Sequence, residues 1–288
     1  MNPHMFRQFA QITYARAGIR LSEGKESLVS ARIAKRIRAL GLTGEQEYLE
    51  YLQEDDSGEE LVQFLDVIST NFTSFMREPD HFDLLATHLR ARADEGRREL
   101  SIWSAASSTG EEPYSIAITA LDALAGTSTK VRILATDIST RVLEAASRGA
   151  YDGARLDKLS KVQRTKYFER VRTPAGEESY VVRPEVRELL VFRRLNLAHP
   201  PFPMKGPFDA VFCRNVMIYF DAPVRQGLVR EIERMLGPDN PLMIGHAETL
   251  TGIKTRLITM QPSVYRQPGT TARTVATAAE PETCGSRS

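Results

Sequence analysis

Cysteine is scarce in this sequence, and so are tryptophan and long apolar runs. The 288 residues include two cysteines and one tryptophan. Two cysteines about 70 residues apart give neither a disulfide framework nor a cysteine metal cluster, and no metal site is expected. No apolar run approaches the ~20 residues that cross a bilayer, and the N-terminus lacks the apolar core of a signal peptide. We therefore expect a monomer in the reducing cytoplasm, without direct membrane insertion.

An excess of charge of one sign is also missing. The net charge is +1, with 26% charged and 42% hydrophobic residues, so no global field attracts nucleic acid or a membrane. Basic and acidic residues are nevertheless unevenly distributed along the chain. Residues 1–42 carry eight Lys and Arg against two Glu, whereas residues 43–66 carry nine Asp and Glu and no basic residue. The length fits one large domain and one small domain.

The first 70 residues predict a helical domain. Apolar residues recur at helical spacing in two segments that end at Gly18 and Gly41. These residues are Phe6, Phe9, Ala10, Thr13 and Ala17 in the first segment, and Val29, Ile33, Ile37 and Leu40 in the second. Thr43-x-x-Gln46 and Ser57-x-x-Glu60 match the capping-box pattern and predict two further helices.

The rest of the chain predicts a doubly wound α/β sheet over residues 71–266, because short apolar runs alternate with segments of helix length. The runs are Leu100–Trp103, Val131–Ala135, Leu189–Phe192, Phe208–Phe212 and Pro241–Ile244. The interval between the second and third runs is too long for a simple crossover. Its turn, Thr173-Pro-Ala-Gly176, predicts an inserted β hairpin at about 160–188. Residues 267–288 predict a disordered tail.

A loop of small residues follows the first predicted strand and leads to two acids, Glu111 and Glu112, at the start of a helix. Small residues let a ligand approach the backbone. Paired carboxylates would repel a phosphate and hold a cationic group such as an ammonium or a sulfonium. The alternative is that both acids only offset the helix dipole.

Asp137 ends the second predicted strand, 27 residues after Gly110. An acid at this place commonly accepts hydrogen bonds from ribose hydroxyls, although an Asp that caps the next helix would look the same. Together with the acidic loop, Asp137 suggests S-adenosylmethionine rather than a dinucleotide, because that ligand offers a ribose and a cation but no phosphate.

Two further segments complete the candidate site. Arg214-Asn215-Val216 follows the fourth predicted strand without the Pro-Pro typical of enzymes that methylate amino groups. Cys213 beside it is interpreted as a buried small side chain rather than a nucleophile. In Ser69–Glu78, Arg77 is either an exposed helical charge or a bidentate carboxylate clamp.

The sequence resembles the chemotaxis receptor methyltransferases, the CheR family, over residues 5–266. The resemblance lies in Asn71-x-Thr73-x-x-x-Arg77-Glu78, Ser104–Ser115, Phe212–Asp221 and Gly245-His-Ala-Glu248. It implies a helical N-terminal domain and a Rossmann-like methyltransferase domain with a small inserted antiparallel β subdomain. It also implies methyl esterification of glutamates on chemoreceptor cytoplasmic helices, with S-adenosylmethionine as donor and S-adenosylhomocysteine as product.

The resemblance also implies a set of site residues. Those that would line the cofactor site are Asn71, Thr73, Arg77, Glu112, Asp137, Asn196, Leu197, Asn215 and Val216. Arg77 and Tyr219 would also face the substrate. We assign Glu112 to the methionine ammonium, Asp137 to the ribose, and Asn215 and Val216 to adenine or backbone atoms.

The basic face of the second predicted helix would suit an acidic receptor helix bundle, or be only a solvated surface. Its residues are Arg32, Lys35, Arg36 and Arg38. A receptor C-terminal peptide could add to the β subdomain, but Thr173–Gly176 departs from the glycine-rich turn of family members that bind one. Rival functions are methylation of a free carboxylic acid or nucleic acid, and a cofactor-binding adaptor without turnover. The missing Pro-Pro and the near-neutral charge count against nucleic acid.

Overall fold

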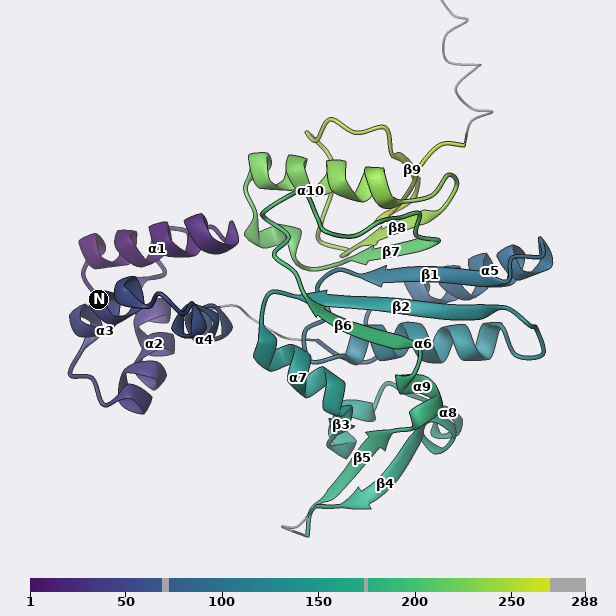
Figure 1. Ribbon diagram of the computed structural model, residues 1–288, viewed down its shortest axis with the longest axis horizontal. Coiled ribbons are helices and arrows are strands. Elements are labelled where there is room, and N and C mark those ends of the chain that lie inside the picture. The colour runs from purple at the N-terminus through teal and green to yellow at the C-terminus, as the bar shows by residue number, and fades with distance from the viewer. Residues whose placement is uncertain (69–72, 174–175, 270–288) are drawn as a thin grey trace, which may run out of the picture.

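The N-terminal part of the computed structural model, which describes residues 1–68, 73–173 and 176–269, is helical as predicted. It contains α1 (Pro3–Ala17), α2 (Glu26–Leu40), α3 (Glu45–Glu54) and α4 (Glu59–Ile68). Gly18 and Gly41 end the first two helices at φ values of 67° and 70°. The rings of Phe9, Tyr48 and Phe64 pack together at the centre. The Phe9 ring centroid lies 5.6 Å from that of Phe64 and 6.1 Å from that of Tyr48. These helices form a separate lobe in Figure 1.

The two capping boxes predicted for this domain are wrong in detail. Helix α4 receives its capping from Asp55, whose carboxylate accepts hydrogen bonds from the amides of Ser57, Gly58, Glu60 and Leu61. At α3 the N-cap is Gly44, and Thr43 bonds to Glu47 rather than to Gln46. An Asp two residues before the expected cap reaches more orphan amides than the shorter Ser side chain does.

All five predicted strands are present in a seven-stranded sheet of order β6-β2-β1-β7-β8-β10-β9. The strands β1 (Glu99–Ser104), β2 (Lys130–Asp137), β6 (Leu190–Arg194), β7 (Ala210–Cys213) and β8 (Pro241–Ile244) run parallel. The sheet ends in an antiparallel pair that the sequence analysis missed, β9 (Ile258–Gln261) and β10 (Val264–Arg266).

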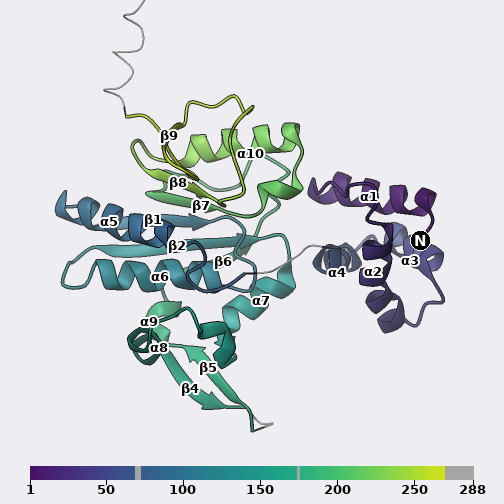
Figure 2. The same cartoon turned by 180° about the vertical axis from the view of Figure 1, so that it is seen from behind.

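Helices cover both faces of this sheet (Figures 1 and 2). Helices α5 (Asp80–Asp94) and α6 (Glu111–Ala123) pack with Leu100 and Ile102 of β1 on one face, and α7 (Thr140–Arg148) packs at β2 and β6. Helix α10 (Ala222–Met235) covers the other face, where Trp103 and Val211 are fully buried. The alternation of Ile102 and Trp103 between the two cores is the period of two expected for a strand.

The predicted β hairpin is present as β4 (Phe168–Arg172) and β5 (Glu178–Val182), which pair antiparallel. A third strand, β3 (Ala150–Tyr151), pairs with β5, so the small sheet begins before the predicted start at about residue 160. Three short helices flank it, Gly153–Leu156, α8 (Lys161–Tyr167) and α9 (Pro184–Arg187). The middle of the turn at 173–176 and the predicted tail beyond residue 269 lie outside the described residues.

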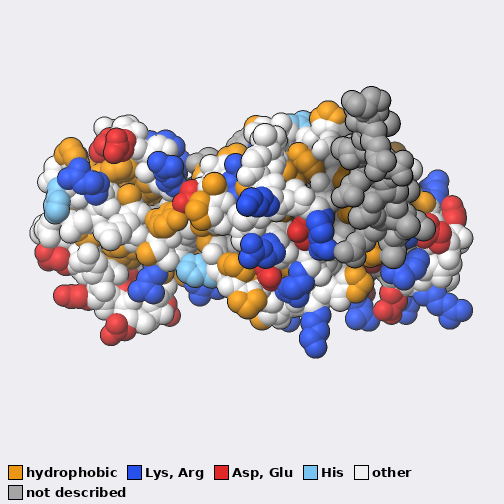
Figure 3. All heavy atoms as spheres, turned by 90° about the horizontal axis from the view of Figure 1, so that it is seen from above, with side chains coloured by type: hydrophobic (Ala, Val, Ile, Leu, Met, Phe, Trp, Pro, Cys, Tyr) orange, Lys and Arg blue, Asp and Glu red, His pale blue; other side chains and the backbone are white. Residues whose placement is uncertain are grey.

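The described helices are all too short or too polar to cross a membrane. In the space-filling view of Figure 3, acidic and basic side chains are mixed over both lobes.

Candidate functional site

The candidate site lies where β1 and β7 end side by side at the carboxyl edge of the sheet. Ser104 of β1 pairs with Phe212 of β7. From β1 the strands that follow in the sequence are added first on one side, as β2 and β6, and then on the other side, as β7 and β8, so the strand order changes direction between β1 and β7. Loops diverge at such a switch point and leave a crevice for a ligand. Two pockets open here, with empty volumes of about 490 and 540 Å³.

The first pocket is mainly apolar and lies partly under the helical domain. Its lining includes Ala17 and Ile19, which come from the end of α1 and the residues after it. The two domains are bonded directly at this point. The Arg20 amide donates to the Tyr219 carbonyl at 2.9 Å, and the Tyr14 hydroxyl donates to Asp221 at 2.7 Å. The site is therefore a cleft between domains, not a feature of the sheet alone.

The second pocket is more polar and continues from the first. Both pockets share Ala106, Asp137, Val216 and Tyr219. Every predicted cofactor or catalytic residue within the described chain lines at least one of them. The polar pocket is lined by Thr73, Arg77, Glu112, Asp137, Asn215, Val216 and Tyr219, and the apolar pocket by Asp137, Asn196, Leu197, Val216 and Tyr219. The remaining predicted residue, Asn71, lies outside the described residues.

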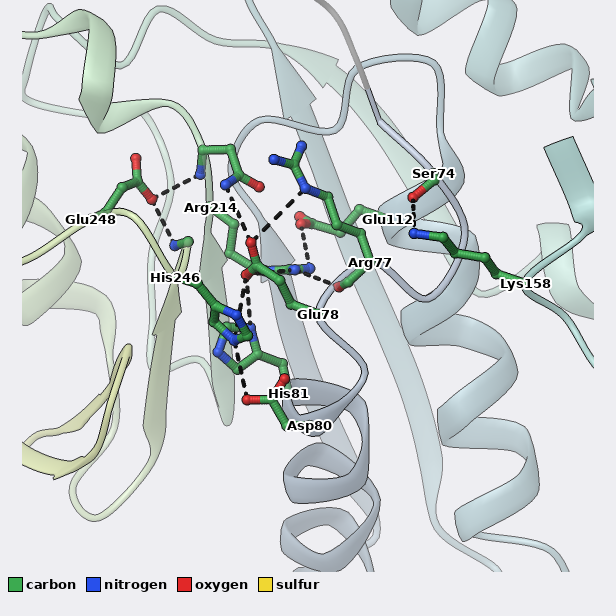
Figure 4. Close-up of polar contacts among 12 residues, drawn as sticks. Ser74, Arg77, Glu78, Asp80, His81, Glu112, Lys158, Arg214, His246 and Glu248 are labelled. Carbon is green, nitrogen blue, oxygen red and sulfur yellow. Dashed lines mark hydrogen bonds and ion pairs between the residues drawn. The ribbon is translucent and has the colours of Figure 1, made fainter.

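Arg214 connects the walls of the polar pocket (Figure 4). Its side chain is only 1% exposed. It donates to Glu112 at 3.1 Å, to Glu78 at 2.9 Å, and to the carbonyl of Arg77. Burial alone would raise the pKa of Glu78, but the pairing with Arg214 outweighs burial and holds that pKa below its usual range. The loop that carries Arg77 is thus tied to the end of β7.

Glu112 lies in the cleft as predicted, whereas Glu111 does not. Glu112 accepts a hydrogen bond from Ser104 at 2.8 Å and pairs with Arg214. Its burial raises its pKa in spite of Arg214. Glu111 is fully buried and pairs with Arg155, beside the small sheet, and is not among the residues that line either pocket. The prediction that Glu111 and Glu112 together hold a cationic group is therefore wrong for Glu111. Only Glu112 is placed to do so.

Asp137 lies where the two pockets meet. One carboxylate oxygen accepts from the Ser108 amide at 2.9 Å and the other from the Ser139 amide at 3.0 Å. Helix α7 is capped by the Ser139 side chain, so Asp137 is not its N-cap side chain. Burial raises the pKa of Asp137. A carboxylate offers about four lone-pair sites, so Asp137 can also accept a hydrogen bond from a ligand hydroxyl.

Glu248 supports the loop after β7. Its carboxylate accepts hydrogen bonds from the amides of Gly245 at 2.6 Å, Asn215 at 2.8 Å and Ile218 at 3.3 Å. Asn215 has a φ of 58°, a left-handed conformation that Asn tolerates better than most residues. The loop that presents Asn215 and Tyr219 to the cleft is therefore held by one half-buried acid.

Glu78, Arg214 and Glu248 received no individual role from the sequence, although each stands in a motif quoted for the resemblance and Arg214 lies in a predicted site segment. Their roles depend on contacts between segments up to 137 residues apart, which spacing does not reveal. Cys213 is fully buried and burial raises its thiol pKa well above the usual range, in agreement with its interpretation as a core side chain.

The predicted docking residues lie on α2, away from the cleft. Arg36 donates to Glu60 at 2.9 Å, and the Arg32 side chain donates to the carbonyl of Ile68, so both bond within the helical domain. Lys35 and Arg38 are exposed.

Comparisons with known proteins agree with this arrangement. Residues 4–69 match the family model described as "CheR methyltransferase, all-alpha domain", and residues 71–266 match "CheR methyltransferase, SAM binding domain". The chain is 42% identical over 260 residues to the "Chemotaxis protein methyltransferase" of Escherichia coli (strain K12), covering 90% of this chain and 89% of the relative. It is 36% identical over 264 residues to that of Borreliella burgdorferi, covering 89% and 92%. The chain belongs to the CheR methyltransferase family, and its second domain is the S-adenosylmethionine-binding domain of that family.

Proposed function

We propose that the protein transfers the methyl group of S-adenosylmethionine to glutamate side chains on chemoreceptor cytoplasmic helices. The products are a glutamate methyl ester and S-adenosylhomocysteine. The observation that carries the proposal is the continuous cleft that joins an apolar pocket, Asp137, and a polar pocket lined by Arg77 and Tyr219.

The cleft fits the shape and polarity of the donor. Its apolar end, with Ile19, Leu197 and Phe220, suits an adenine ring. Asp137 at the junction suits the ribose hydroxyls. Glu112 in the polar pocket is an acceptor for the methionine ammonium, and Arg214 beside it offers guanidinium donors to the methionine carboxylate.

When bound, S-adenosylmethionine supplies an electrophilic methyl group on a positively charged sulfur. A substrate glutamate has a pKa near 4.3 and is ionised at pH 7, so it needs no general base. Among the described residues, no histidine lines either pocket. The protein's task is alignment in a partly dry site.

Arg77 and Tyr219 are the residues that we assign to the substrate. Both line the polar pocket, and Arg77 comes from the segment between the domains. A planar guanidinium can hold a carboxylate in a fixed orientation through two hydrogen bonds. Tighter binding of the ground state would not speed transfer, so the role of Arg77 is orientation, with the Tyr219 hydroxyl as a second donor.

Two surfaces are proposed for the receptor. Lys35 and Arg38 on α2 would attract an acidic helical bundle, while Arg32 and Arg36 support the fold of the domain. Strand β4 is an edge of the small sheet and could receive a receptor C-terminal peptide as an added strand. Methylation of a receptor with and without its last residues tests that second contact. The same rate for both would remove it.

The proposed reaction is tested with radiolabelled S-adenosylmethionine and a chemoreceptor cytoplasmic fragment. We expect label on the receptor that is released as methanol by mild alkali, because esters hydrolyse there and methylated amines do not. Receptor label that is stable to base, or no label, would refute the glutamyl ester. A cofactor-binding adaptor would bind the donor without labelling the receptor.

A further inference from the structure

A cluster of two histidines and two carboxylates begins at Glu78, the residue after Arg77 in the chain (Figure 4). Glu78 lies just before α5, Asp80 and His81 are its first two residues, and His246 comes from the loop after β8 (Figure 4). His246 Nε2 lies 3.2 Å from Asp80 Oδ2 and 4.0 Å from Glu78 Oε2. His81 Nδ1 lies 3.6 Å from Glu78 Oε2. One ligand atom from each of Glu78, His81 and His246 lies within 4.8 Å of the others.

His81 is the unusual member of this cluster. Its side chain is fully buried, and neither ring nitrogen has a hydrogen-bond partner among the described residues. A neutral imidazole has one donor and one acceptor nitrogen, and a buried polar group left unsatisfied costs about 1–3 kcal/mol. The ring stands edge-on to His246, with 5.1 Å between centroids. His81 thus faces the space between the other three side chains with unused bonding capacity.

The donor set indicates the class of ion that would fill this space. Two imidazoles with one or two carboxylates suit Zn²⁺ and related divalent transition metals, whereas Mg²⁺ and Ca²⁺ prefer oxygen ligands alone. A tetrahedral Zn²⁺ with bonds near 2.1 Å needs ligand atoms about 3.4 Å apart. The separations here require side-chain movements of about 1 Å, which the half-exposed His246 and Asp80 can make.

We propose that His81 and His246, with the carboxylates of Glu78 and Asp80, form a binding site for a divalent transition-metal ion of the Zn²⁺ type beside the methyl-transfer cleft. The proposal stands on the geometry of the cluster and does not depend on the substrate proposed above. Glu78 Oε2 also bonds Arg214 at 2.9 Å, so an ion would compete with Arg214 for this oxygen. Arg214 keeps Glu112 and the Arg77 carbonyl as partners.

The test is direct metal binding to the full chain, without a purification tag. A Cys284→Ser background removes the thiol of the C-terminal segment from consideration. Titration calorimetry with Zn²⁺ should show one equivalent bound, and Co²⁺ in its place should give the intense visible absorption of a four-coordinate ion. His246→Ala should weaken binding at least tenfold, since a ligand is lost. That ring is half exposed, so the variant should fold.

His199→Ala is the matched control, because His199 is an exposed histidine outside the cluster. It should bind Zn²⁺ as the parent does. Asp80→Asn is a second variant, which should weaken binding through the loss of a carboxylate. No stoichiometric binding at about 100 μM metal, or equal affinity in the parent and in His246→Ala, would overturn the proposal.

Discussion

Arg214 joins three segments of the site that are distant in the chain. It bonds the carbonyl of Arg77, the carboxylate of Glu78 and the carboxylate of Glu112, all within a nearly dry environment. Removal of one member of a buried ion pair typically costs about 3–5 kcal/mol, because the partner charge stays buried. The backbone position of Arg77 is therefore held by Arg214, whose guanidinium bonds the Arg77 carbonyl.

Glu248 offers a test at the residue scale. In Glu248→Gln the side-chain volume stays, but the amide presents a donor where backbone amides require an acceptor. If the lost hydrogen bond weakens transition-state binding by about 1–3 kcal/mol, kcat/KM for methyl transfer should fall roughly 5- to 150-fold. Steady-state kinetics and calorimetric binding of S-adenosylhomocysteine measure it. Glu177→Gln, at an exposed position in the turn before β5, is the control, and equal kinetics for the two variants would contradict the role of Glu248.

His88 gives a pH dependence at the same scale. Its Nε2 lies 2.9 Å from the Asp209 carbonyl, and burial lowers its pKa below 6.5. The unfolded chain therefore binds a proton at this histidine more readily than the folded chain does. The stability that the neutral, buried His88 contributes is present above pH 6.5 and is lost as the pH falls below 6.5. Urea unfolding at pH 7.5 and 5.5 should show a smaller loss in His88→Gln than in the parent. An unchanged loss would contradict the assignment, and the exposed His199→Gln should behave as the parent.

At the scale of elements, the turn between β1 and α6 depends on Gly110. Its φ is 101°, and a Cβ there would lie 2.6 Å from the Tyr151 hydroxyl and 2.9 Å from the Ala146 Cβ. Gly110→Ala should therefore lower the free energy of unfolding by about 1–3 kcal/mol. Gly126→Ala is the matched control, because Gly126 has a φ of 82° with nothing within 4 Å of the added Cβ. Chemical denaturation measures the free energy of unfolding of both variants, and the difference between their losses is the cost of the clash. Equal losses in the two variants would show that the clash costs nothing.

The elements that the sequence predicted well are those with buried, continuous apolar runs. Strands β7 and β8 are fully buried and were visible as such runs. Strand β9 was missed because all four of its residues are exposed at the sheet edge, so no apolar period marks it. At the site, Glu112 and Asp137 were predicted from their place after strands. The bridging role of Arg214 and the support from Glu248 were not predicted, because pairing between distant segments leaves no spacing to detect.

At the scale of the whole molecule, the helical domain contributes directly to the cleft, because Ala17 and Ile19 line the apolar pocket. Lys35 and Arg38 of the same domain are exposed on α2, where we propose that the receptor docks. Some of the basic residues of the N-terminal segment pair with acidic residues inside the domain, as Arg36 does with Glu60. Fewer basic residues are left for a receptor than the composition suggests.

The double variant Lys35→Glu, Arg38→Glu tests this docking surface. Receptor methylation should fall several-fold at low salt, and the difference from the parent should shrink as salt rises, because exposed charges are screened. Affinity for S-adenosylhomocysteine should not change. Arg98→Glu, an exposed arginine before β1, is the control for a charge change elsewhere. Equal methylation rates for the double variant and the parent would remove the docking role.

We propose above that Arg77, from the segment between the domains, orients the substrate carboxylate in the cleft. The most direct measurement is the rate of methyl transfer from saturating S-adenosylmethionine to a receptor fragment by Arg77→Ala. The account predicts transfer at or near background while the variant still folds and binds S-adenosylhomocysteine. Turnover close to that of the parent under these conditions would contradict it.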